Sequence, residues 1–346
     1  MSDPLARDSA AGEQLCLVTG ATGFIGGRLA ARLAQEGYRV RALARQSSDT
    51  THLAALDIEI VTGDLADTAS LEGAVAGCAQ VIHCAALVSD WATTAEITEA
   101  NVEGTRRLLD AATGASVVRF IHLSTTDVYG HPGGPPVDES FTDDGRIHNW
   151  YAHTKRQAER AVRDAGQTGR IETAILRPAT VYGPGSRDVI GEIARAIRGG
   201  HMLLIDRGRA VAGLCFVENL LDAALLALRH QAAPGNAFNV SDDLAVTWRQ
   251  LTDDLAAGLS CRQVRFSMPY RLAGAIGFSL EQGYRLLRSS TGLSTPPLLS
   301  RQAVQVLGRD QLFSSRKLRQ TLGWEPRVGY DEGLSATLEW LKSDYL

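Results

Sequence analysis

The sequence is short of cysteine, has no long apolar run and carries little net charge. Its 346 residues include five cysteines, an odd number without C-x-x-C spacing, which argues against disulfides and metal sites and suits a reducing cytoplasm. No stretch reaches the roughly 18 uninterrupted apolar residues of a membrane span. Residues 1–13 lack the apolar core of a signal peptide and are expected to form a flexible tail. A net charge of −4 gives no reason to expect a nucleic-acid partner.

A glycine-rich segment, LCLVTGATGFIGG, occupies residues 15–27 and is the most informative stretch of the chain. Its apolar start is typical of a buried parallel strand, and a helical apolar period that begins at Phe24 follows it directly. The three glycines, each three residues from the next, allow a tight turn and let a diphosphate approach the first N–H groups of the helix. The segment predicts a dinucleotide site whose contacts are Gly20, Thr22, Gly23, Phe24, Ile25 and Gly26.

The G-x-x-G-x-x-G spacing, in the loop TGATGFIG, resembles the cofactor loop of the extended short-chain dehydrogenase/reductase superfamily. Further apolar runs, at 38–43, 58–61, 81–86, 117–123 and 171–176, are expected to form parallel strands. The resemblance implies an α/β fold with a doubly wound parallel Rossmann sheet over residues 14–180. It also implies a smaller substrate-binding lobe over 181–346, whose segment at about 214–240 returns to the Rossmann half, and a homodimer.

Arg45 decides which cofactor is expected. NAD-binding folds place an acidic residue about 20 positions beyond the glycines, where it bonds the ribose 2′-hydroxyl. Arg45 stands 45 − 26 = 19 residues beyond Gly26, and no Asp or Glu lies at this predicted strand end. Because an arginine suits a 2′-phosphate, NADP(H) is favoured over NAD(H). The alternative is a solvated surface arginine without a ligand.

The resemblance implies further cofactor contacts along the chain. Asp64 is expected to contact the adenine amine, with capping of the helix near Asp67 as its alternative. Asn101 supports the active site or caps a helix, and His83 suits a core position as well as a functional one. The remaining expected contacts are Leu65, Ala85, Pro178, Tyr151 and Lys155.

Tyr151 and Lys155 lie four residues apart in a helix predicted over 150–165, so both project from one face. A phenol titrates at about pH 10, and an adjacent ammonium is expected to lower that pKa. Tyr151 could then exchange a proton with a carbonyl/alcohol pair while Lys155 also bonds the nicotinamide ribose. Superfamily members place a helping hydroxyl four residues before the tyrosine of their V-Y-G turn. That offset lands on Thr125, with Ser124 as the runner-up.

Two positions distinguish this chain from the sugar-nucleotide enzymes of the same superfamily. Those enzymes hold a diphosphate with an R-x-x-N segment and a later arginine, whereas this chain has Thr180 and Ala212 at the matching positions. Each missing charge-assisted hydrogen bond is worth about 1.5–3 kcal/mol. An NDP-sugar epimerase or dehydratase is therefore the alternative function.

The C-terminal third favours a lipophilic substrate. Residues 268–288 place Leu272, Ile276, Leu280 and Tyr284 at helical spacing beside arginines. Core packing is favoured for this amphipathic helix, with a lid or a membrane contact as the alternative. The LGWEP segment at 322–326 resembles the tail of the 3β-hydroxysteroid dehydrogenase-like branch. The sequence predicts an NADP(H)-dependent oxidoreductase that interconverts a secondary alcohol and a ketone on a bulky apolar molecule.

Overall fold

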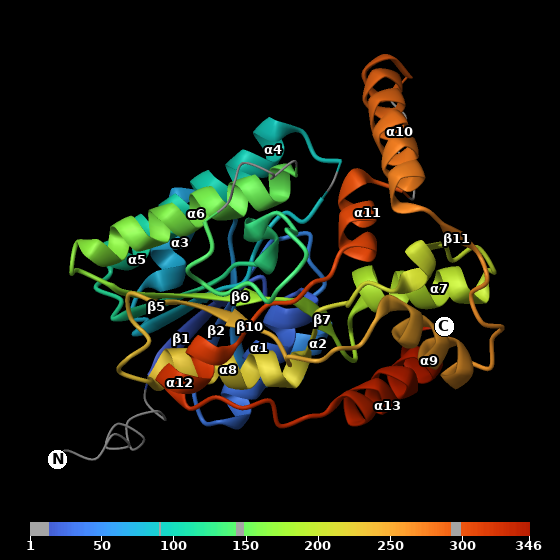
Figure 1. The fold of residues 1–346 in the computed structure, drawn as a ribbon. Helices are drawn as coiled ribbons and strands as arrows, with labels where there is room; N and C mark the ends of the chain where they lie inside the picture. Colours follow the sequence, from blue (N-terminus) through green and yellow to red (C-terminus); the bar gives the residue numbers. More distant parts are fainter. Residues whose placement is uncertain (1–13, 90, 143–148, 292–298) are drawn as a thin grey trace.

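Seven parallel strands form the central sheet of the protein (Figure 1). This computed structural model describes residues 14–89, 91–142, 149–291 and 299–346, so the predicted tail lies outside the described residues. The strand order is β10-β6-β5-β4-β1-β2-β3, which confirms the predicted doubly wound Rossmann topology. The strands are β1 (Leu15–Thr19), β2 (Arg39–Ala44), β3 (Ile58–Thr62), β4 (Gln80–His83), β5 (Arg119–Leu123), β6 (Glu172–Pro178) and β10 (Ala237–Val240).

Helices cover both faces of the sheet, as Figure 1 shows. Successive strand residues point to opposite faces, so Val18 packs with the helices α1, α8 and α12 whereas its neighbour Leu17 packs with α3, α5 and α6. Burial on both sides explains why these strands are uninterrupted apolar runs. The two layers are α1 (Phe24–Gln35), α8 (Val217–Arg229) and α12 (Arg316–Leu322) on one face, and α3 (Thr68–Val75), α5 (Gly104–Gly114) and α6 (Trp150–Gln167) on the other. The short helix α2 (Thr51–Ala54) follows β2, and the short helix α4 (Thr94–Thr98) comes before α5.

Most of the chain beyond residue 180 builds a second hydrophobic core beside the sheet, centred on Trp248 and Tyr182. The chain returns to the Rossmann half through α8 and β10, where β10 pairs with β6, and Trp324 fills the core beneath α8. The boundary predicted at residue 180 stays a prediction. The lobe contains β7 (Thr180–Tyr182) paired with β9 (Leu214–Phe216), β8 (Leu204–Ile205) paired with β11 (Ser267–Met268), and the helices α7 (Glu192–Arg198), α9 (Trp248–Gly258), α10 (Tyr270–Thr291), α11 (Arg301–Gly308) and α13 (Tyr330–Trp340).

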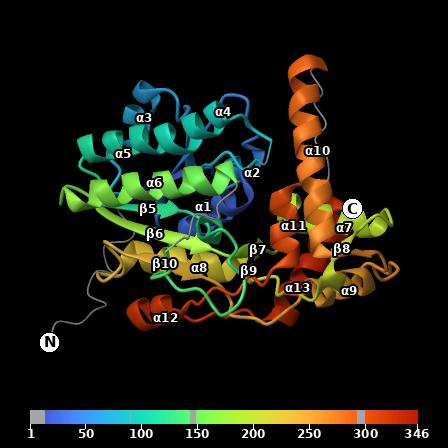
Figure 2. The same ribbon diagram turned by 45° about the horizontal axis from the view of Figure 1, so that its top comes forward.

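Helix α10 projects away from the body of the lobe (Figure 2). Leu272 and Leu280 are 51% and 41% exposed, so the core packing expected for the predicted apolar stripe is wrong at these two positions, whereas Tyr284 of the same stripe is buried. The buried face of α10 carries Ala273 and Glu281 beside Tyr284, because the helix packs on α11 and on the Trp91 ring, whose centroid lies 4.9 Å from that of Tyr284. Within the described residues, no helix has the length and apolar character needed to cross a membrane.

Candidate active site

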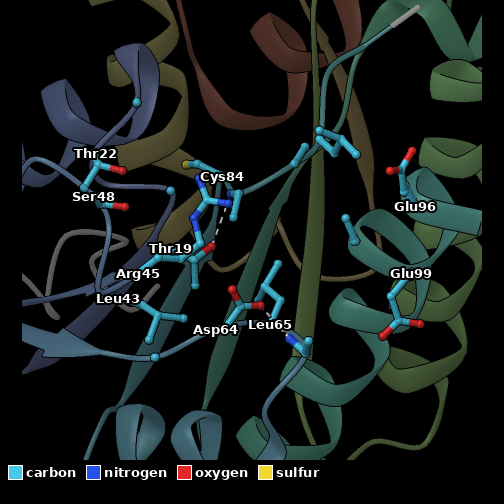
Figure 3. Close-up of a pocket in the computed structure, with 18 residues that line it drawn as sticks. Thr19, Thr22, Leu43, Arg45, Ser48, Asp64, Leu65, Cys84, Glu96 and Glu99 are labelled. Atoms are coloured by element: carbon cyan, nitrogen blue, oxygen red, sulfur yellow. Dashed lines mark hydrogen bonds between the residues drawn. The ribbon is translucent and has the colours of Figure 1, made fainter. Parts of the chain in front are cut away.

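A cavity of about 610 Å³ opens at the carboxyl ends of β1, β2, β3 and β4 (Figure 3). It lies where β1 neighbours both β2 and β4, the point at which the strand order reverses and where ligands bind in open α/β sheets. Of the predicted cofactor contacts, its lining includes Gly20, Thr22, Gly23, Arg45, Asp64, Leu65 and Ala85, whereas Phe24, Ile25, Gly26, Asn101, Tyr151, Lys155 and Pro178 lie outside that lining.

The glycine turn between β1 and α1 requires the absence of side chains. Gly20 has a φ of +70°, and a Cβ there would lie 2.7 Å from the backbone nitrogen of Ala85. A Cβ on Gly26 would overlap the carbonyl oxygen of Gly20. Gly23 is the N-cap of α1 and supplies no side-chain acceptor, so the first N–H groups of the helix stay available to an anion. This cradle fits the diphosphate of a dinucleotide.

Arg45 follows the last residue of β2 and lines the rim of the cavity with Ser48. Its backbone carbonyl accepts a hydrogen bond of 2.9 Å from the Ser48 nitrogen, so the turn brings a guanidinium and a hydroxyl to one side of the cavity. Figure 3 shows Ser48 beside Thr22 and the Arg45 side chain beside Thr19, with Asp64 and Leu65 lower in the view. The rim therefore pairs a cation with hydroxyl groups.

Asp64 lines the same cavity and is not the cap of the following helix. The N-cap of α3 is Asp67, whose carboxylate accepts from the Ala69 nitrogen at 3.1 Å. Asp64 accepts from the Ala66 nitrogen at 2.9 Å through one oxygen, and its side chain is exposed at the cavity. The capping alternative is wrong for this residue.

Asn101 holds a wall of the cavity rather than a helix end. It lies inside a π-helical turn, Glu99–Glu103, where its amide accepts from the Leu87 nitrogen at 2.7 Å and donates to the Leu87 oxygen at 3.0 Å. Asn101 also donates to the Thr154 hydroxyl on α6. The N-cap alternative is wrong, because the amide ties the loop after β4 to the helix that carries Tyr151.

His83 at the end of β4 is a buried core residue. Its two ring nitrogens bond the hydroxyls of Thr19 at 2.7 Å and Thr105 at 3.0 Å. Burial, followed by the charge of Lys155, lowers the pKa of His83 to about 3. The ring is therefore neutral at physiological pH and serves packing.

Two of the predicted catalytic residues, Thr125 and Lys155, lie at the carboxyl end of β5, and Tyr151 precedes Lys155 by one turn of α6. Thr125 follows this strand and caps the 3₁₀ turn Thr126–Tyr129 by accepting from the Asp127 nitrogen at 3.1 Å. The Asn149 side chain caps α6 by accepting from the Tyr151 nitrogen at 2.6 Å. One turn later, the Lys155 ammonium donates to the carbonyl of Leu123, the last residue of β5, at 2.6 Å.

The expected effect of Lys155 on the phenol is wrong. Burial raises the pKa of Tyr151 above its usual value, and the Asp127 carboxylate raises it further. Burial also lowers the pKa of Lys155 to about 8, against the opposing effect of Glu159. Removal from water disfavours the charged form of each group, and neither group is among the charges that shift the pKa of the other.

A buried ion pair behind these residues was missed by the sequence argument. Ser124 donates to Glu159 at 2.6 Å, and Arg177 binds both oxygens of Glu159 at 2.8 and 2.6 Å. Arg177 also donates to the hydroxyl of Tyr129 at 2.6 Å. The sequence did carry a signal for this pair, namely charged residues at positions where the pattern predicts burial. Glu159 follows Lys155 on one helix face, and Arg177 interrupts an apolar strand.

The similarities to known proteins agree with this geometry. The model of the NAD dependent epimerase/dehydratase family matches residues 16–241. The chain belongs to this family. As a family member with reductases among its relatives, it is an NAD(P)-dependent oxidoreductase with a nicotinamide cofactor.

Two relatives of this family member align with almost all of its length. A 4-hydroxy-2-methyl-3-oxo-4-farnesyl-3,4-dihydroquinoline-1-oxide ketoreductase from Stigmatella aurantiaca is 32% identical, over 92% of this chain and 94% of its own. A 2-alkyl-3-oxoalkanoate reductase from Shewanella oneidensis is 28% identical, over 92% of this chain and 84% of its own. A dTDP-glucose 4,6-dehydratase from Streptomyces venezuelae, solved with NAD bound, shares the fold with a TM-score of 0.78 at 24% identity, covering 96% of this chain and 98% of that one.

Proposed function

We propose that this protein is an NADPH-dependent ketoreductase that acts on a bulky, largely apolar ketone. The observation that carries the proposal is that Lys155 contacts the end of β5 beside Thr125, with Tyr151 one turn earlier on the same helix face, while a dinucleotide cradle opens at the carboxyl edge of the same sheet. The names of two relatives, a ketoreductase of a farnesylated quinoline and a 2-alkyl-3-oxoalkanoate reductase, support both the reaction and an apolar substrate.

In this mechanism Thr125 orients the substrate oxygen and Tyr151 gives it a proton. A nicotinamide ring, when bound, supplies the hydride that reduces the carbonyl carbon. Because the pKa of Tyr151 is raised, the phenol is protonated at neutral pH, which suits proton donation and hence the direction of ketone reduction. Lys155 fixes the end of β5 by donating a hydrogen bond to the Leu123 carbonyl.

The lobe supports a ketone substrate over a sugar nucleotide. The Thr180 hydroxyl donates to the Ala212 carbonyl at 3.0 Å, and Ala212 is fully buried. The Arg177 guanidinium forms a buried ion pair with Glu159. These three positions therefore present no cation to a diphosphate.

The direct test replaces Tyr151 with phenylalanine. Reduction by Tyr151→Phe should fall by about 10²–10⁴-fold, because general acid catalysis contributes about that factor, while NADPH affinity is kept. Tyr345→Phe, which alters a half-buried tyrosine packed on Trp340 in the C-terminal turn, is the control and should keep full activity. The assay follows nicotinamide absorbance with 2-alkyl-3-oxoalkanoates, quinoline ketones and steroid ketones as substrates. Near-complete activity of Tyr151→Phe would refute the assignment, and epimerisation of an NDP-sugar without net oxidation would favour the alternative.

Arg45 supports NADP(H) as the cofactor. Losing one charge-assisted hydrogen bond to a 2′-phosphate costs about 1.5–3 kcal/mol. Arg45→Ala should therefore raise the KM for NADPH by roughly 10–100-fold and leave the KM for NADH unchanged. A wild-type enzyme that prefers NADH would overturn this cofactor assignment. The homodimer expected from the resemblance is tested by sedimentation of the same preparation.

A further inference from the structure

One face of α6 carries the proposed acid, the lysine and a third ionisable residue in succession. Tyr151, Lys155 and Glu159 are each four residues apart, so their side chains follow one another by about one helical turn. Lys155 is 2% exposed and Glu159 is 1% exposed. A carboxylate this deeply buried needs compensation by charges and hydrogen bonds.

Glu159 receives that compensation from three elements. One oxygen accepts from the Ser124 hydroxyl and the Arg177 Nε, and the other accepts from a terminal nitrogen of Arg177. Arg163, one turn further along α6, donates to the second oxygen at 2.8 Å from a partly exposed position. The pairing with Arg177 is bidentate, which fixes the orientation of both groups.

This network reaches the proposed active site through the end of β5. Ser124 lies between Leu123, whose carbonyl accepts from Lys155, and Thr125. The Ser124 nitrogen donates to the Leu176 carbonyl on β6 at 2.7 Å, so backbone and side chain of Ser124 are both fixed. A shift of Glu159 would therefore move the acceptor of Lys155 and the hydroxyl of Thr125 together.

We propose that Glu159 is a positioning residue of the reaction, which keeps Lys155 as a buried ammonium and locks the Ser124–Thr125 strand end through its pair with Arg177. The inference rests on the proposed ketoreductase function for its kinetic consequence. Its structural core, the charge state of Lys155, can be measured without turnover.

The groups around Lys155 leave this role to Glu159. From α6 itself the Glu159 carboxylate raises the pKa of Lys155, while burial lowers it to about 8. The thiol of Cys84 after β4 is neutral, because burial raises its pKa to about 12. His83 on β4 and His122 on β5 are held neutral by burial. The positive charge of Arg177 is matched by Glu159, and Tyr151 stays a neutral phenol.

The chain suits a direct titration because it has three lysines, Lys155, Lys317 and Lys342. Lysine labelled with ¹³C at Cε gives three NMR resonances in the full-length protein, and Lys317→Arg and Lys342→Arg assign the third to Lys155. In Glu159→Gln the pKa of Lys155 should fall, because the Glu159 carboxylate is the main charge that raises it and because Arg177 loses its counter-charge. Glu172→Gln is the matched control, because it neutralises the partner of buried Arg119 in the same sheet, and the pKa of Lys155 should not change.

Arg163→Gln should shift the pKa of Lys155 in the opposite direction, upward. This substitution removes a partly exposed cation that pairs with Glu159, so the Glu159 carboxylate stabilises the Lys155 ammonium more strongly. The pKa of Lys155 should therefore rise by a few tenths of a unit. This surface substitution decides the question if Glu159→Gln fails to fold. An unchanged Lys155 pKa in folded Glu159→Gln, or an unchanged or lower one in Arg163→Gln, overturns the proposal.

Kinetics supply the second readout. The alkaline limb of kcat should move to lower pH in Glu159→Gln, with kcat about tenfold lower and KM little changed, and Glu159→Asp should restore the wild-type limb because it keeps the charge. If activity falls equally at all pH values and the alkaline limb of the kcat profile does not move, the role of Glu159 is only structural. If no ketone is turned over, the proposed function fails while the lysine titration still decides this inference.

Discussion

His122 offers a sharp test of how burial governs the charges around this site. It lies on β5 and is fully buried, and neither ring nitrogen has a hydrogen-bond partner within the described part of the chain. Burial, followed by the charge of Lys155, lowers its pKa well below the usual value. Removing the imidazole by His122→Leu should therefore stabilise the protein, because an unsatisfied buried polar group costs about 1–3 kcal/mol.

The sign of the pH dependence follows from the same burial. Below about pH 6.5 the unfolded state binds a proton at His122 that the folded state does not bind, so stability falls as the pH falls. We expect His122→Leu to be more stable than the wild type by about 1–3 kcal/mol at pH 7 and by a larger margin at pH 5. The stability of the variant should still fall somewhat as the pH falls, because burial also lowers the pKa of His83, to about 3.

Urea unfolding of both proteins at pH 5 and pH 7 measures these differences, provided that the slopes agree. His201→Leu, which replaces an exposed imidazole, should follow the wild-type pH dependence. A His122→Leu protein that is less stable than the wild type at both pH values would refute the reasoning, because the imidazole would then be contributing more than it costs.

Three further predictions concern other parts of the molecule. Thr125→Ala should lower kcat by about 10²-fold, whereas Ser124→Ala should lower it less because that hydroxyl already donates to Glu159; equal losses in steady-state assays would contradict these roles. Combined Leu272→Ser and Leu280→Ser should change the free energy of unfolding by less than about 1 kcal/mol, since both side chains are exposed on α10; a large loss in urea unfolding would restore the core interpretation. Asn219→Ala should cost about 3 kcal/mol or more in the same assay, since it orphans the backbone nitrogens at 327 and 328, and a near-neutral effect would contradict that network.

Local patterns determined much of the fold. The apolar run before Gly20 predicts β1 because a strand buried on both faces has no polar position, and the glycine spacing predicts the cradle because only glycine fits a positive φ pressed against a neighbouring backbone. Tyr151 and Lys155 share a face for the same local reason, the helical period. Each of these inferences needs only neighbours in sequence.

What the tertiary structure alone decided depends on partners distant in sequence. Helical spacing groups Leu272 with Leu280 but does not say what covers them, and in the fold α10 turns a different face to α11. The pKa of Tyr151 depends on how much water the whole fold excludes, and this reversed the shift expected from its neighbour alone. Glu159 and Arg177 meet only because α6 packs on β6, since a buried ion pair is specified by which elements come together and not by the pattern within either one.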